Sequence, residues 1–390
     1  MKRHVILLLW FIFAVFIVET TVKAGNGSQV IGVGPISRAM GGTGIANPQS
    51  AVSAIYLNPG ALIFTNRMDF GASIISANAT GTINAPTVLS AESNEKLFAM
   101  PSIGMAMHPK EWFVMGAAVI GEGGGGTDWR STSLEPYVKT SRLFLSQMAF
   151  ILGGSVKLMN ESLGIGVSIP ITYQTLDLGS GVSTDVGLAA KLGIAYELRG
   201  APSGGAERGQ GILRLGAYFK SPQFLKPKHQ IIGMAELSNP MEFGLGVSYI
   251  GLKNLILSLD GKYILWDSAE GFGDLSTANG MDWQNQFVVA FGVQVGSVDK
   301  PLLDLFLLRA GYNYGSSVLK DGYLPTIELP MAVNHHISFG MSIDIGLSMH
   351  LNVGGVIGLS GSTNVDTSPR QGQGELSTWS IDVGMSGIFG

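Results

Sequence analysis

The chain has 390 residues, of which 46% are hydrophobic, 13% are charged, 55 are glycine and none is cysteine. Soluble globular proteins carry about 25% charged residues, so a surface covered by water alone does not fit this composition. The net charge of −4 argues against a nucleic-acid partner, and the absence of cysteine excludes a disulfide scaffold. Beyond the N-terminal region no apolar run approaches the ~20 residues of a membrane helix, so alternating strands are the favoured way to distribute the apolar excess.

The N-terminus has the pattern of a secretory signal peptide. Lys2 and Arg3 precede an apolar stretch from Val5 to Val18, and Ala24 supplies the small residue that signal peptidase requires. We therefore predict that residues 1–24 are a signal peptide that is cleaved. An uncleaved membrane anchor is the alternative interpretation.

Residues 25–66 differ from the rest of the chain. They are rich in glycine, contain Pro35, Pro48 and Pro59, and lack sustained alternation. Their apolar residues are too numerous for a disordered tail. A compact, partly apolar segment before the first strand is typical of a plug. We predict that residues 25–66 form a hatch in the lumen of a barrel built from residues 67–390.

Polar and apolar residues alternate in the C-terminal half with the period of two that a strand requires. In the segment Thr378–Phe389, Ser380 and Asp382 share one face, whereas Trp379 and Ile381 share the other. This pattern is typical of strands with one face toward lipid and the other toward a lumen. The same alternation is found in residues 254–266, 284–295, 333–344 and 347–353.

A soluble β-sandwich also alternates, but two features favour a transmembrane barrel. The predicted strands are about ten to thirteen residues long, which suits a tilted span of a bilayer, and soluble strands are usually shorter. Short connections also alternate with long ones, as in outer-membrane barrels. We predict an all-β protein, a transmembrane antiparallel β-barrel of about 14 strands in the bacterial outer membrane. Long connections are predicted at residues 78–96, 122–141, 221–240, 267–282, 315–331 and 360–375.

Several motifs lie in order along nearly the whole chain after residue 24. The most specific is in the hatch, where Gly41, Gly42 and Gly44 are followed by the triplet Asn58-Pro59-Gly60. Together the motifs resemble the FadL/TodX family of outer-membrane long-chain fatty acid and hydrocarbon transporters, whose hatch carries Asn-Pro-Ala. The other matching segments are Gly123–Trp129, Glu242–Tyr249, Trp266-Asp267, Arg309–Tyr314 and Asn334–Gly340.

The resemblance implies a barrel of about 14 strands, plugged by the hatch, that takes up hydrophobic compounds such as fatty acids or hydrocarbons without an energy source. It also implies a lumenal path and a lateral exit toward the bilayer at a kink in the third strand. The implied partners are a hydrophobic small molecule, outer-membrane lipid, lipopolysaccharide and the barrel-assembly machinery. A monomer without nucleic acid is expected.

The early strands carry the composition that such a path needs, because they are apolar on both faces. Contact with the apolar hatch is the alternative explanation for this composition. The candidate path residues are Phe98, Met100, Phe113, Met115 and Ile120.

An interrupted strand wall is favoured where proline and glycine gather. Proline cannot donate to the strand ladder, and glycine marks positions where a strand bends or bulges. The candidate residues for a lateral gap are Pro101, Gly121, Gly123 and Gly124.

Charged residues that face a lumen normally pair with one another and brace the barrel. A single unpaired cation would instead hold a fatty carboxylate by a charge-assisted hydrogen bond. Lys157 and Arg309 are the candidates for this carboxylate contact. The sequence leaves the ligand open between fatty acids and uncharged hydrocarbons.

No motif favours an enzyme, a metal site or a cofactor. The segment Gly41–Gly44 lacks the lysine and the strand-loop-helix context of a phosphate-binding loop. His335 and His336 are neighbours on a predicted strand, so their rings point to opposite faces and do not share a metal. The remaining alternatives are a structural or adhesive barrel and a general porin.

Overall fold

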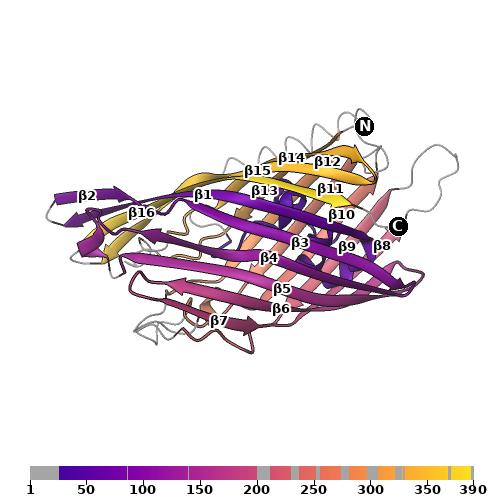
Figure 1. Ribbon diagram of the computed structural model, residues 1–390, viewed down its shortest axis with the longest axis horizontal. Coiled ribbons are helices and arrows are strands. Elements are labelled where there is room, and N and C mark those ends of the chain that lie inside the picture. Colours follow the sequence, from indigo (N-terminus) through magenta and orange to yellow (C-terminus); the bar gives the residue numbers. More distant parts are fainter. Residues whose placement is uncertain are drawn as a thin grey trace.

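The chain folds into long antiparallel strands that surround a short helical segment, as the computed structural model in Figure 1 shows. The predicted signal peptide and Phe389 lie outside the described residues. The structure describes residues 26–85, 87–138, 140–199, 211–229, 237–251, 255–273, 281–296, 306–320, 327, 330–367 and 370–387.

The strands are β1 (Arg67–Ala85), β2 (Thr87–Glu92), β3 (Leu97–Lys110), β4 (Phe113–Asp128), β5 (Arg142–Leu158), β6 (Leu163–Asp177), β7 (Val182–Leu188), β8 (Lys191–Arg199), β9 (Ile212–Lys220), β10 (Glu242–Gly251), β11 (Leu255–Ile264), β12 (Gln286–Val295), β13 (Phe306–Gly315), β14 (His335–Gly346), β15 (Met349–Thr367) and β16 (Arg370–Gly387). The helices are α2 (Gly34–Ala39), α3 (Ala51–Leu57) and the 3-10 helices η1 (Pro59–Phe64), η2 (Glu135–Tyr137) and η3 (Trp266–Ser268). None of the helices in the described ranges is long and apolar enough to cross a membrane.

Within the described residues, 14 strands form a closed antiparallel ring. The ring closes where β1 pairs with β16 in one continuous register, from Met68 opposite Gly387 to Asn84 opposite Gln371. The strands β2 and β7 lie outside the ring, paired with β1 and β6 respectively. Closure removes the free edges that an open sheet would expose. The predicted antiparallel barrel of about 14 strands is confirmed.

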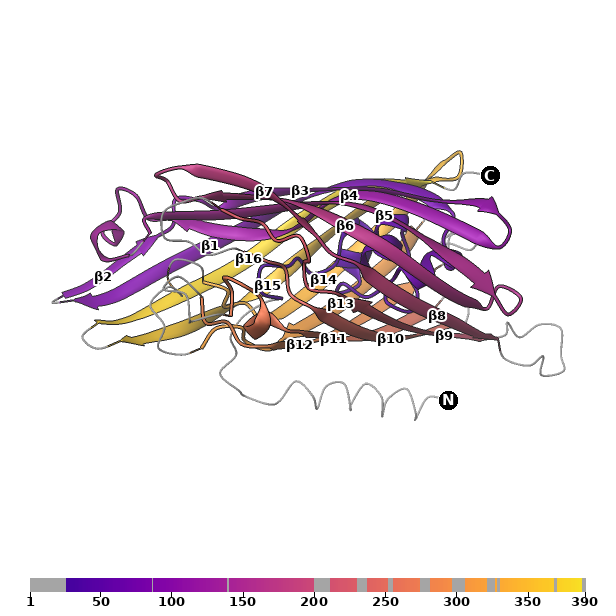
Figure 2. The same cartoon turned by 90° about the horizontal axis from the view of Figure 1, so that it is seen from below.

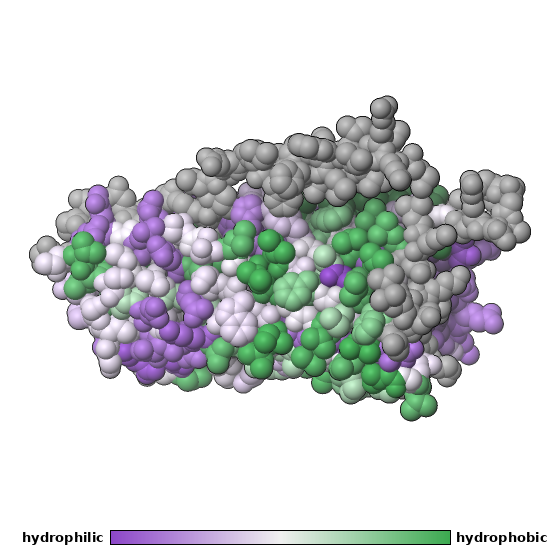
Figure 3. All heavy atoms as spheres, turned by 90° about the horizontal axis from the view of Figure 1, so that it is seen from above, coloured by the Kyte–Doolittle hydropathy of each residue, from purple (hydrophilic) through white to green (hydrophobic). Residues whose placement is uncertain are grey.

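The faces of the strands are those that alternation predicts. In β16, Ser380 and Asp382 are buried, whereas Trp379 and Ile381 are 44% and 54% exposed on the outside. Exposed large apolar residues occur on most strands of the ring. Figure 3 shows hydrophobic side chains gathered over the middle of one outer face and hydrophilic ones toward the ends. The outer surface therefore matches a wall that faces lipid.

Two of the predicted long connections are largely strand. The segment 78–96 contains the end of β1 and all of β2, and 360–375 is the far part of the β15–β16 hairpin. A third, 122–141, begins with the end of β4. In the far part of β1 the outward face is no longer apolar, because Asn78, Thr80 and Thr82 lie there, whereas Ile83 on the inward face is buried. Backbone pairing does not need apolar residues on the outward face and continues beyond them.

The inner segment, residues 26–66 before β1, lies inside the ring. Figures 1 and 2 show α2, α3 and η1, drawn in indigo, enclosed by the strands. Local signals explain their ends: Ser50 caps α3 by accepting a hydrogen bond from the Ser53 amide at 3.1 Å, and Asn58 caps η1 by accepting one from the Gly60 amide at 3.0 Å.

Glycines on the lumenal face of the wall make room for this segment. A Cβ atom at Gly166 would overlap the Pro59 carbonyl, and one at Gly193 would overlap the Asn58 side chain and lie 2.7 Å from the Gly60 amide nitrogen. Such distances are far below van der Waals contact. The high glycine content thus lets the wall approach the inner segment closely. Similar close approaches occur at Gly104, Gly216, Gly292 and Gly311.

Candidate functional site

The strand β4 departs from β3 beyond Ile120. Pairing between β3 and β4 ends at Ser102 opposite Ile120, whereas β4 stays paired with β5 as far as Asp128. The β4–β5 register shifts between Gly121 and Gly123, which places a bulge there, and a bulge bends the strand that carries it. The first residues of β3 therefore have no β4 partner.

Residues 28–30 of the inner segment pair with the part of β4 that has no β3 partner. Gln29 forms a bridge with Gly123, and the Gly124 amide donates to the Ser28 carbonyl at 2.8 Å. A side chain at Gly123 would overlap the Ser28 carbonyl, and Gly124 has a φ of 139°, which favours glycine. The glycine-rich sequence of β4 is thus explained by close backbone contact with residues 28–30.

A cavity of about 260 Å³ lies between the inner segment, the bent part of β4 and the neighbouring wall. Its lining is mostly apolar and comes from β1, β3, β4, β5, β14, β15, β16 and residues 330–333. The apolar lining includes Val30, Ile31, Ile75, Ala77, Ala79, Leu97, Phe98, Ala99, Met100, Phe144, Leu145, Met331, Val333, Val356, Leu376 and Trp379; the polar lining includes Asn26, Ser28, Gln29, Arg38, Ser146, His336, Thr378 and Ser380.

The cavity reaches the outer side of the wall where β3 is paired with β1 but not with β4. Leu97 and Ala99 line it, although they are exposed and belong to the outward face of β3. Phe98, which belongs to the inward face, stacks on Phe144 of β5 with ring centroids 5.5 Å apart and an interplanar angle of 11°. This stack joins β3 to β5 beside the bent part of β4.

The inner segment is anchored to the wall by buried polar groups. The Arg38 Nε donates to the Asp382 carboxylate at 2.7 Å, and Arg38 also donates to Ser380 Oγ at 2.8 Å. The Asp260 carboxylate accepts from the amides of Gly44 and Ile45 at 2.7 and 2.9 Å. These bonds hold the segment at β16 and β11.

The Asn58-Pro59-Gly60 triplet makes a further anchor. Asn58 Nδ2 donates to the Ile45 carbonyl at 2.7 Å and to the Ile194 carbonyl of β8 at 2.9 Å. One side chain thus joins two parts of the inner segment to the wall. Gly41 is held at β13 and β14, because its amide donates to Ser338 Oγ and its carbonyl accepts from Asn313 Nδ2, both at 2.9 Å.

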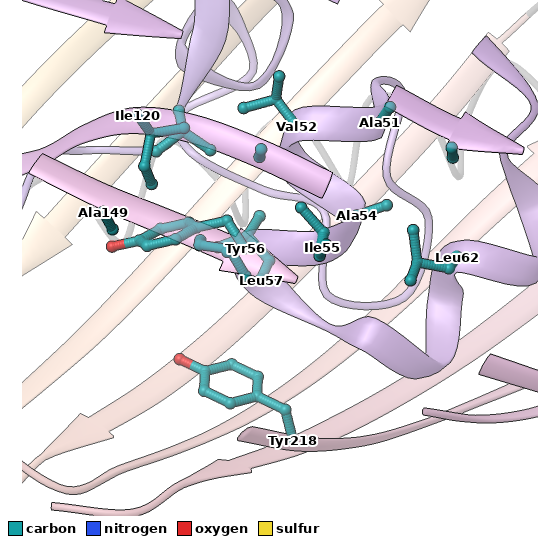
Figure 4. Packing of buried hydrophobic residues seen from close by; sticks show 14 of the residues in the cluster. Ala51, Val52, Ala54, Ile55, Tyr56, Leu57, Leu62, Ile120, Ala149 and Tyr218 are labelled. Carbon is teal, nitrogen blue, oxygen red and sulfur yellow. The ribbon is translucent and has the colours of Figure 1, made fainter. Parts of the chain in front are cut away.

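An apolar cluster packs α3 and η1 against β3, β4 and β5. Val52, Ile55 and Leu62 of the inner segment belong to one cluster with Ile120 of β4, and Figure 4 shows how these side chains lie. Tyr56 belongs to the same cluster, and burial together with the nearby Glu122 and Glu242 carboxylates raises the pKa of its hydroxyl well above the usual value. The cluster fills the part of the lumen next to the cavity.

A second apolar cluster lies where the long connections meet the wall. Trp266, Phe272 and Trp283 pack edge to face or tilted, with ring centroids about 5 Å apart, and none is exposed by more than 1%. Leu145 belongs to this cluster and Met331 packs against it, and both also line the cavity. Apolar surface therefore continues from the long connections to the cavity.

The candidate path residues fall into two groups. Phe98 and Met100 line the cavity, and Ile120 is buried in the cluster beside it. Phe113 and Met115 lie on the outer face of β4, where Met115 is 43% exposed, so they do not line the lumen. The lumenal residues of β4 alternate from Val114, which is fully buried, so Phe113 and Met115 fall on the other face.

The candidate gap residues gather at the bend. Gly123 and Gly124 line the cavity. Pro101 directly precedes Ser102, which is the first residue of β3 that pairs with β4. A Cβ atom at Gly121 would lie 2.9 Å from the Cβ atom of Met100.

The two candidate carboxylate contacts lie elsewhere. Lys157 forms an ion pair of 3.3 Å with Glu161 at the short β5–β6 hairpin. Arg309 donates to Gln294 at 2.7 Å and to Ser342 at 2.5 Å. Neither residue lines the cavity.

Sequence reasoning missed Arg38 and His336, which line the cavity. The signal for Arg38 was its isolation, because it is the one charged residue between Gly25 and Asn66. A lone cation inside an apolar plug needs a partner in the wall, and the lumenal Asp382 supplies it.

No model of a known protein family and no curated protein matches the chain. Solved structures do match it. The toluene transporter TodX of Pseudomonas putida superposes with a TM-score of 0.67 at 17% identity, over 92% of this chain and 99% of TodX. A Pseudomonas aeruginosa FadL homologue gives 0.71 at 12% identity, over 93% and 100%. The toluene transporter TbuX of Ralstonia pickettii gives 0.64 at 17% identity, over 92% and 99%. The chain therefore has the fold of the FadL/TodX channels, as its motifs predict.

Proposed function

We propose that the protein takes up small hydrophobic compounds across the bacterial outer membrane without an energy source. The observation that carries this proposal is that the start of β3 has no β4 partner. Behind it lies a mostly apolar cavity whose lining includes outward-facing residues of β3. A solute in that cavity can pass sideways into lipid without crossing water. The solved structures of similar fold, which include two named toluene transporters, support transport rather than catalysis.

The proposed path has three parts. The compound enters at the long connections, which we place outside the cell, beside the apolar cluster around Trp266 and Trp283. The compound then enters the cavity past Leu145 and Met331, which contact both regions. It leaves between β3 and β4, beside Phe98 and Ala99.

The cavity volume indicates the size of the compound. An engineered protein cavity of about 150 Å³ binds benzene, and the cavity here measures about 260 Å³. A substituted monoaromatic or a short aliphatic compound fits this space. We include in the proposal that residues 25–66 plug the lumen, that residues 1–24 are cleaved, and that the barrel works as a monomer in lipid and lipopolysaccharide after insertion by the assembly machinery.

A matched pair of variants tests the lateral exit. Ala99→Trp places a large side chain at the mouth of the cavity, and Ile103→Trp places the same side chain on the same outward face, where β3 is paired with β4. In cells that produce the protein, we expect Ala99→Trp to lower the uptake of radiolabelled toluene several-fold. Cells that produce the Ile103→Trp variant should take up toluene as before.

Conductance in planar bilayers separates the proposal from its main alternative. The plugged barrel should pass negligible ion current. A large, steady conductance would identify a general porin and overturn the proposal. Uptake that is equal in both tryptophan variants would rule out the exit at β3.

A further inference from the structure

The cavity has one polar corner, formed by His336, Thr378, Ser380 and Arg38. His336 on β14 lies opposite Gly358 on β15, and Gly358 lies opposite Thr378 on β16. A Cβ atom at Gly358 would lie 3.0 Å from His336 Cδ2 and would overlap Thr378 Oγ1. The histidine and the threonine therefore approach each other across a glycine, next to the Ser380 that binds Arg38.

His336 has an unmet hydrogen-bonding group at this corner. Its side chain is 7% exposed, and within the described residues its Nδ1 has no hydrogen-bond partner. Buried polar groups in proteins are nearly always paired. The neighbouring His335 is different, because it lies on the outward face and its Nδ1 is paired with the Tyr312 hydroxyl. This nitrogen is itself fully buried, so a ligand group at the corner would satisfy it once the imidazole turns toward the cavity that it lines.

The corner carries no unpaired positive charge among the described residues. Among the described residues that line the cavity, Arg38 is the only lysine or arginine, and it is paired with Asp382 at 2.7 Å. Both side chains are almost fully buried. A carboxylate placed here would lose its water without gaining a free counter-ion, and this is unfavourable. A neutral hydrogen-bonding group avoids this cost.

We propose that the corner binds the hydroxyl group of a neutral, mostly apolar ligand, such as a phenol or a medium-length alcohol. A neutral imidazole has one donor and one acceptor nitrogen, and a threonine hydroxyl can act as either. The hydroxyl group of the ligand can thus both donate and accept. Its apolar body lies against Met100 and Val333, which also line the cavity. The proposal rests on the proposed function, because it assumes that the cavity holds a solute.

Isothermal titration calorimetry measures the binding without a reporter side chain. The full-length protein in detergent is titrated with 4-bromophenol, bromobenzene and 4-bromobenzoate at neutral pH, and the same titration of protein-free detergent is subtracted. One neutral hydrogen bond corresponds to a preference of about fivefold. We expect 4-bromophenol to bind about that much more tightly than bromobenzene, with 4-bromobenzoate the weakest.

Variants of the corner test the role of the histidine. His336→Leu should abolish the preference for the phenol over bromobenzene, whereas His336→Gln should retain part of the preference. Thr378→Val is a second variant that should reduce the preference without altering the histidine. Each comparison uses one detergent concentration, so partition into micelles cancels.

The outcomes separate the two proposals. If His336→Leu and Thr378→Val both keep the phenol preference, or if the benzoate binds most tightly, the inference about the corner is overturned and uptake of apolar compounds still stands. If none of the probes binds, the cavity does not hold a solute, and both proposals fail.

Discussion

A single ion pair joins α2, in the proposed hatch, to β16, the last strand of the barrel. Arg38 and Asp382 are 344 positions apart in the chain, yet their side chains meet at 2.7 Å with 6% and 0% exposure. A buried pair of this kind contributes little relative to an apolar pair of the same shape, but breaking it leaves a charge without a partner. Its removal therefore reports how firmly the hatch is held.

We expect Arg38→Met to destabilise the protein by about 3–5 kcal/mol, because Asp382 would remain buried and unpaired. Thermal unfolding in detergent, followed by circular dichroism, measures the effect. The double variant Arg38→Met/Asp382→Leu should recover much of the loss. Lys157→Met is the control, since its partner Glu161 is 60% exposed and the pair contributes little. Equal melting temperatures for Arg38→Met and the control would contradict the anchoring role.

At the scale of elements, the strands were predictable because alternation is a local property. The faces of β16 follow directly from the order of Ser380, Ile381 and Asp382, and the structure confirms them. The far parts of β1 and β15 were not predictable in this way, because their pairing continues where the outward face is no longer apolar.

The site was less predictable than the strands, because it depends on which residues lie side by side after closure. Composition pointed to Phe98 and Met100, but it also pointed to Phe113 and Met115, which lie on the outer face. In an unbroken apolar run, the sequence does not show which residues face inward and which face outward. The polar corner at His336 combines three strands with the hatch, and no local pattern in the sequence reports such a meeting.

The glycines of the wall test how closely the elements fit. Gly193→Ala would add a methyl group that overlaps the Asn58 side chain and lies 2.7 Å from the Gly60 backbone nitrogen. We expect the triplet to be displaced, the melting temperature to fall, and the hatch to become sensitive to added protease. Gly261→Ala is the matched control in β11, since a Cβ atom there meets nothing within 4 Å. If the hatch is equally protected from protease in both variants, the wall adapts to the extra atom.

At the scale of the whole molecule, the hatch and the wall form one packed unit. The apolar cluster of α3 and η1 shares Val114, Ile120 and Ala149 with the wall. Lumenal polar groups such as Asp69 and Asp260 take their hydrogen bonds from hatch amides. Without the hatch these groups would face an open lumen, where water and ions can replace the lost partners.

Deletion of residues 26–65 is therefore expected to convert a barrier into a channel. The ring itself should still close, because β1 begins at Arg67 and pairs with β16 without help from the hatch. In planar bilayers we expect steady ion conductance from the deletion variant and negligible conductance from the full chain. Deletion of Thr87–Glu92, the strand β2 outside the ring, is the control and should leave the conductance negligible. Heat-modifiable migration in gels checks that each variant has folded. A folded variant without its hatch that stays silent would mean that the long connections, rather than the hatch, close the lumen.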